Sequence, residues 1–80
     1  EGNKNDHLNL GHIEWSLGNK KAAIESYRQS IKKSNYDDEW FSRVFEDDKK
    51  HLLKNGIHPF DVILMMDYLK LMELHEDKPV

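Results

Sequence analysis

Two glycines seven residues apart, Gly11 and Gly18, constrain the fold of this chain more than any other feature. They lie in the stretch LNLGHIEWSLGNKKAAIESY, residues 8–27, where apolar side chains recur at helical spacing around both. Glycine lowers helix stability by about 1 kcal/mol relative to alanine, so a glycine inside a helix indicates a neighbour too close for a side chain. Gly11 therefore predicts close packing against a second helix, on which Ala23 is the small residue. Gly18 predicts the turn between the two helices.

The chain is expected to form four helices and no strand. No stretch alternates apolar and polar residues as a half-buried strand does. Asp6 and Asn19 are the expected N-caps of the first two helices, and Pro59 fits the first turn of the last, where its missing N–H needs no partner. The predicted helices span residues 6–17, 19–33, 37–54 and 59–75.

The apolar side chains of the first helix fall on two stripes at helical spacing. The stripe expected to pack on the second helix consists of Leu10, Ile13 and Leu17. The other stripe consists of Leu8, His12 and Trp15. The pattern therefore assigns the first stripe to the interior of the hairpin and leaves the second for another contact.

Residues 4–37 resemble a tetratricopeptide repeat (TPR), a helix–turn–helix unit of about 34 residues. The positions that match the family pattern are Leu10, Gly11, Gly18, Ala23, Ile24, Tyr27 and Ile31. Five positions depart from it, with His7 in place of Trp, Glu14 of Tyr, Lys20 of an aromatic residue, Ser30 of Ala and Asn35 of Pro. These departures are typical of a unit near the end of an array.

Residues 38–76 repeat the order helix, glycine turn, helix, with Gly56 aligned to Gly18 at a spacing somewhat longer than one such unit. We interpret them as a degenerate TPR-like or capping hairpin, followed by a frayed tail over residues 77–80. The predicted fold is one all-α domain, a right-handed stack of two antiparallel hairpins forming a short TPR-like α-solenoid. Because the chain opens at Glu1 instead of methionine, it is expected to be an excerpt of a longer protein or a processed product.

The resemblance implies a scaffold that binds a peptide or a protein surface. Carried over by position, the residues that would line its groove are Asn5, Leu8, His12, Trp15 and Ser16. The alternative is that Leu8 and Trp15 simply pack against a neighbouring helix. Some family members hold a terminal carboxylate with paired lysine and asparagine. Lys4, Asn5 and Asn9 are of the right type here, but one repeat lacks the further donors of such a clamp.

The last helix suggests a second function, because its apolar residues cover most of its circumference. Such a helix needs contacts on several sides, from a second copy of the chain or from the rest of a longer TPR protein. The residues predicted for a two-fold homodimer contact are Val62, Met66, Leu69 and Met72.

Composition argues against several other classes of function. The net charge is -3 with no basic tract, which argues against nucleic acid as the main partner. Residues 60–74 are too short and too charged to cross a membrane, and without a signal-peptide pattern a cytoplasmic location is expected. There is no cysteine, no motif surrounds the serines, and no Gly-rich phosphate loop is present, so neither an enzyme nor a cofactor is expected.

Metal binding has weak support in the sequence. Asp47, Asp48 and His51 share one helical turn, but no second ligand-bearing element accompanies them, so they are interpreted as solvated charges. The set of His75, Glu76 and Asp77 is weaker still.

Overall fold

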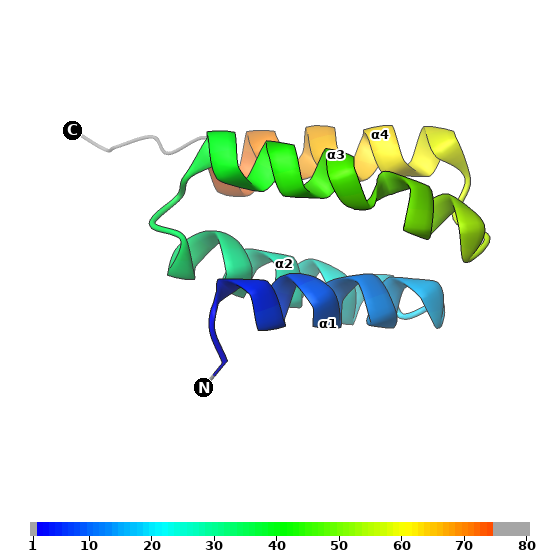
Figure 1. The fold of residues 1–80 in the computed structure, drawn as a ribbon, viewed down its shortest axis with the longest axis horizontal. Coiled ribbons are helices and arrows are strands. Elements are labelled where there is room, and N and C mark those ends of the chain that lie inside the picture. Colours follow the sequence, from blue (N-terminus) through cyan, green and yellow to red (C-terminus); the bar gives the residue numbers. More distant parts are fainter. Residues whose placement is uncertain (1, 75–80) are drawn as a thin grey trace.

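The computed structural model describes residues 2–74 and consists of two helix hairpins in two layers (Figure 1). The first layer holds α1 (Lys4–Ser16) and α2 (Lys20–Lys33). The second layer holds α3 (Asp38–Lys54) and α4 (Pro59–Leu69), and α4 continues into a π-helical turn, Lys70–Leu74. The predicted all-α fold with four helices is confirmed for these residues. The predicted frayed tail and the weaker metal set, His75, Glu76 and Asp77, lie outside the described residues.

Polar residues precede each helix. Asn3 caps α1, because its Oδ1 accepts a hydrogen bond from the Asp6 N–H at 2.9 Å while the Asp6 carboxylate accepts from the Asn3 N–H at 3.3 Å. The prediction that Asp6 is the N-cap is therefore wrong: Asp6 is the second member of a capping box. Asn19 precedes α2 as predicted, but its side chain makes no capping bond. Asp37 and His58 cap α3 and α4 with their side chains.

The turns within the hairpins lie at the predicted glycines. Gly18 and Gly56 have φ angles of 88° and 97°, in the left-handed region that other residues rarely adopt. The link between the layers uses the same region without glycine, at Asn35 and Tyr36, with φ angles of 67° and 59°. The Tyr36 N–H donates to the Ile31 carbonyl at 2.9 Å, which closes the end of α2.

Gly11 has the close neighbour that its place in a helix predicts. A Cβ atom at Gly11 would lie 2.5 Å from Cε1 of Tyr27 and 2.6 Å from its Cδ1. Tyr27 and Ala23 on α2 are both fully buried. The helix spacing in the first hairpin therefore depends on a missing side chain, and the neighbour that needs the space is an aromatic ring.

The two stripes of α1 face the opposite way from the prediction. Leu10, Ile13 and Leu17 are 43%, 57% and 77% exposed, whereas Leu8 and Trp15 are buried. The reason is that α3 covers the second stripe, so that the core of the whole molecule lies on that side. A periodic pattern identifies the two faces of a helix, but the position of a third helix decides which face is buried.

The helix starts of the two hairpins correspond to each other. Asp37 is the N-cap of α3 as Asn3 is of α1, and His58 is the N-cap of α4 as Asn19 is of α2. The interval between the second pair is the longer one, because α3 has 17 residues and α1 has 13, so α3 is one turn longer, and the loop after α3 has one more residue than the loop after α1. The extra turn of α3 also explains why Gly18 and Gly56 lie further apart in the sequence than the N-caps Asn3 and Asp37.

None of the helices described over residues 2–74 combines the length and apolar character needed to cross a membrane. Within the same range, no group of three His, Asp or Glu side chains is placed to hold a metal ion.

Adding a side chain at Gly11 should destabilise the fold. We expect Gly11→Ala to lower the free energy of unfolding by about 1–3 kcal/mol, because the new methyl group overlaps the buried Tyr27 ring. Urea denaturation followed by circular dichroism measures this. Asn9→Ala, at an exposed site on the same helix, is the control and should leave stability unchanged or slightly higher. Equal stability of the two variants would contradict the close contact.

Candidate functional site

Four of the five predicted groove residues, Leu8, His12, Trp15 and Ser16, lie on the face of α1 that α3 covers. Leu8 is buried, and Trp15 is 8% exposed with its ring stacked on Phe45, at a centroid distance of 6.5 Å. Ser16 is half-buried and accepts a hydrogen bond from Asn55 Nδ2 at 3.2 Å. The interpretation of this face as an open groove is therefore wrong within this chain, and the alternative, packing of Leu8 and Trp15 against a neighbouring helix, is confirmed.

The two remaining predicted groove residues, Asn5 and His12, differ in burial. Asn5 is exposed at the start of α1, away from the covered positions. His12 is half-buried and bonded on both sides of its ring: Nδ1 lies 2.7 Å from the Tyr27 hydroxyl, and Nε2 lies 3.0 Å from Oδ2 of Asp48. This chain of bonds links α1, α2 and α3. Asp48, one of the three side chains interpreted as solvated charges, thus bonds His12 and is only partly exposed.

A single neutral tautomer satisfies both bonds of His12. Nε2–H donates to the Asp48 carboxylate, and Nδ1 accepts from the Tyr27 hydroxyl, whose pKa is raised by burial so that it keeps its proton. Burial lowers the pKa of His12 below its usual value, although the hydrogen bond and the charge of Asp48 act in the opposite direction. Protonation of Nδ1 would deprive the buried Tyr27 hydroxyl of its acceptor. The network therefore holds the fold together in the neutral form of His12.

Two further buried contacts are polar and join α1 to α2. Ser26 Oγ donates to Oε1 of Glu14 at 2.6 Å, and Ser30 Oγ donates to the Lys4 carbonyl at 2.9 Å. Glu14 and Ser30 are two of the positions that depart from the TPR pattern. Their hydrogen bonds give these departures a structural role, because both join the helices of the first hairpin.

The residues predicted for self-association are only partly accessible. Val62 and Leu69 are buried in the core, Met66 is half-buried, and only Met72 is clearly exposed, at 61%. The predicted contact set is therefore wrong for Leu69, which is fully buried, whereas Val62 can be reached only at the bottom of a groove between α3 and α4. The large apolar residues that α4 and the π-helical turn do expose are Phe60, Ile63, Leu64, Tyr68, Leu71 and Met72.

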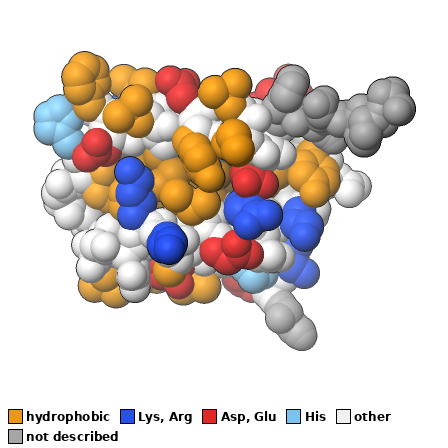
Figure 2. Space-filling model, turned by 180° about the vertical axis from the view of Figure 1, so that it is seen from behind, with side chains coloured by type: hydrophobic (Ala, Val, Ile, Leu, Met, Phe, Trp, Pro, Cys, Tyr) orange, Lys and Arg blue, Asp and Glu red, His pale blue; other side chains and the backbone are white. Residues whose placement is uncertain are grey.

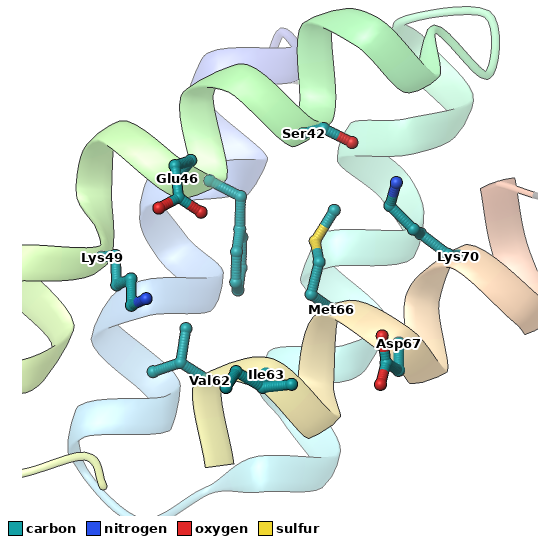
Figure 3. A pocket seen from close by; sticks show the side chains of 9 residues that line it. Ser42, Glu46, Lys49, Val62, Ile63, Met66, Asp67 and Lys70 are labelled. Carbon is teal, nitrogen blue, oxygen red and sulfur yellow. The ribbon is translucent and has the colours of Figure 1, made fainter. Parts of the chain in front are cut away.

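An open groove runs between α3 and α4, and sequence patterns alone did not reveal it (Figure 3). It has a volume of about 250 Å³. We call it the outer groove, and its lining residues are Ser42, Phe45, Glu46, Lys49, Val62, Ile63, Met66, Asp67 and Lys70. A shallower hollow that shares Ser42, Glu46 and Lys70 extends it toward the start of α3. The lining residues recur every three or four positions on each helix, a signal that becomes informative only once the two helices are paired.

The outer groove has an apolar floor between charged walls. Phe45, Val62 and Met66 supply apolar surface, of which Phe45 and Val62 are almost completely buried. On the walls, Glu46 and Lys49 come from α3, Asp67 comes from α4, and Lys70 begins the π-helical turn (Figure 3). Among the described residues, the one ion pair of this wall set joins Lys70 Nζ to Asp38 Oδ1 at 3.6 Å, so Glu46 is available to a cation.

The face of the molecule on which α2 and α4 lie carries a second apolar area. Figure 2 shows apolar side chains gathered along the middle of the face formed by α2 and α4, with charged side chains around them. A hollow in this face is lined by Lys20, Ile24, Leu64, Met65 and Tyr68. Arg28 of α2 lies 3.1 Å from the Glu73 carboxylate and so holds the π-helical turn against the first layer.

Comparisons with known proteins give no relative: no family model, no curated protein and no solved structure matches this chain. The assignment of a function therefore rests on the geometry described above.

Truncation should separate the buried from the exposed stripe of α1. We expect Trp15→Ala to lower the free energy of unfolding by about 3–5 kcal/mol, because it removes an indole packed on Phe45 and Tyr27. Leu17→Ala on the exposed stripe should change stability by less than about 0.5 kcal/mol. Thermal unfolding of both variants measures the difference. A small change for Trp15→Ala would restore this residue as a candidate for partner contact.

Stability should fall in mild acid because of His12. Since the folded pKa of His12 is below that of the unfolded chain, the unfolded state binds more protons as the pH falls through about 6.5. The stability of the wild type relative to His12→Gln should therefore decrease between about pH 7.5 and pH 5. Urea denaturation of the wild type and of His12→Gln at several pH values measures this. Parallel profiles for the wild type and His12→Gln would contradict the assignment.

Proposed function

We propose that this chain is a non-catalytic, TPR-like protein-interaction module that binds a peptide or protein surface through its outer faces. The observation that carries the proposal is the apolar surface left on both layers. On α1, Leu10, Ile13 and Leu17 lie on the side opposite the core. On the second layer, Phe60, Ile63, Leu64, Leu71 and Met72 are exposed. Contiguous exposed apolar surface on a small domain is typical of contact sites for other proteins.

Two features support a TPR-like stacking of the layers, and a third indicates contact with further protein. The interval between the N-caps Asn3 and Asp37 equals the length of one such repeat. The first hairpin closes on Gly11, and α3 packs on its face. Terminal units of helical-repeat proteins need a polar outer face for solubility, whereas both outer layers here keep apolar side chains. The outer layers therefore have the character of internal units that contact further protein.

The polar residues of the interior support a role without chemistry. The trio of Asp48, His12 and Tyr27 has the order of a catalytic relay, but the Tyr27 side chain is fully buried and bonded to His12. Its hydroxyl therefore has no access to a substrate. The role we assign to this trio is to join three helices.

A library of displayed helical peptides of about 20 residues tests the proposal, since shorter peptides seldom form helices in water. We expect the chain to enrich amphipathic peptides with apolar residues at i, i+3, i+4 and i+7. The matched bait is the triple variant Ile13→Lys, Ile63→Lys and Leu71→Lys, which changes exposed positions of both layers and is checked for folding by circular dichroism. Binding to it should be weaker by about tenfold or more. Equal enrichment on both baits, or none above the bare support, would contradict the proposal. Sedimentation of the chain alone shows whether the same residues serve self-association.

A further inference from the structure

The first hairpin already holds a helix in the groove between its two helices, and that helix is α3. The Phe45 ring lies 5.5 Å from the Tyr27 ring and 5.7 Å from the His12 ring, between centroids. Phe41 lies 6.2 Å from Tyr27, and Asp48 accepts the hydrogen bond of His12. In this contact the occupying helix presents aromatic residues at i and i+4 and a charged residue at i+7.

The outer groove lies at the equivalent place on the second hairpin. When α3 is aligned to α1 by the N-caps Asp37 and Asn3, Glu46 and Lys49 correspond to His12 and Trp15. When α4 is aligned to α2 by the N-caps His58 and Asn19, Met66 corresponds to Tyr27. The three positions that contact Phe45 in the first groove thus correspond to three lining residues of the outer groove. Of its remaining lining residues, Ser42, Phe45, Val62 and Lys70 correspond to Leu8, Gly11, Ala23 and Ile31, which are buried in the first hairpin. Ile63 and Asp67 correspond to Ile24 and Arg28, which instead lie toward α4 and the π-helical turn.

We propose that the outer groove binds an amphipathic α-helix of another protein. The helix presents apolar residues at i and i+4 to the floor formed by Phe45, Val62 and Met66, and a lysine or arginine at i+7 to Glu46. The positive charge of the partner residue follows from the comparison of the grooves. In the first groove, Asp48 of α3 bonds His12 of α1. In the outer groove, Glu46 stands at the position of His12, so the occupant needs a cation where α3 has Asp48. This inference rests on the proposed function and adds a site and a partner to it.

The same alignments argue against a second copy of this chain as the occupant. If α1 of another copy lay in the outer groove as α3 lies in the first, Gly11 would stand at the place of Phe45. The groove floor would then receive the polar ring of His7, at the place of Phe41, and no apolar side chain. Glu14 would stand at the place of Asp48 and would face Glu46, with like charges together. The groove therefore fits a helix of different sequence.

Two synthetic peptides that differ only in one charge test the inference. Both are alanine-rich helices of about 20 residues with phenylalanine at i and i+4, and one carries lysine at i+7 where the other carries glutamate. We expect fluorescence anisotropy to give a Kd for the lysine peptide about threefold to tenfold lower than for the glutamate peptide. Glu46→Lys should reverse this order. Asp47→Lys, the neighbouring exposed carboxylate outside the groove, should leave it unchanged.

Amide chemical shifts locate the peptide on the protein. We expect perturbations over residues 42–49 and 62–70, and loss of binding of both peptides to Ile63→Lys, whose position is half-exposed in the groove wall. Perturbations confined to the exposed stripe of α1, or no effect of Glu46→Lys on the order of the two peptides, would overturn the inference while the proposed function stands. Absence of any bound peptide, here and in the displayed library, would overturn both.

Discussion

The contact between Gly11 and Tyr27 determines how the other helices pack. Because residue 11 has no side chain, the Tyr27 ring lies directly on the backbone of α1, and the ring is fully buried. From there it meets Phe41 and Phe45 of α3 edge-on, while its hydroxyl bonds His12. One aromatic side chain of α2 thus contacts both α1 and α3, and the spacing of the first hairpin sets the surface on which the second is built.

Polar bonds fix the register that aromatic packing alone leaves adjustable. His12 joins Tyr27 and Asp48, and Ser26 joins Glu14, each with donors and acceptors in only one satisfactory arrangement. Among the described residues, no buried side-chain nitrogen or oxygen lacks a partner. A shift of one helix along another would break these partly buried bonds and leave the buried Tyr27 hydroxyl without its partner.

The parts of the fold that could be predicted from the sequence are the local ones. Helix spans, the glycine turns and the need for space at Gly11 depend on neighbours within a few residues or on steric demands of the backbone. The turns and the space at Gly11 are confirmed. The number of helices is confirmed too, but α1 begins at Lys4 instead of Asp6, and α4 gives way to the π-helical turn at Lys70. The buried face of α1 could not be predicted, because two apolar stripes compete and the arrival of α3 decides between them. On α4 the apolar residues surround the helix, so periodicity could not distinguish buried Leu69 from exposed Leu64. The outer groove was missed for the same reason, since its lining comes from two helices whose pairing is not local.

The two equivalent grooves differ in a way that separates permanent from reversible contact. The first is walled by Leu8, His12 and Trp15 and is filled by two phenylalanines of the same chain. The outer one has Ser42, Glu46 and Lys49 at those three positions over an apolar floor. Interfaces that form and dissociate combine an apolar centre with a polar rim, whereas obligate ones resemble a core. The substitution of polar for apolar walls therefore suits a helix that binds from outside and leaves again, and it lets the empty groove remain in contact with water.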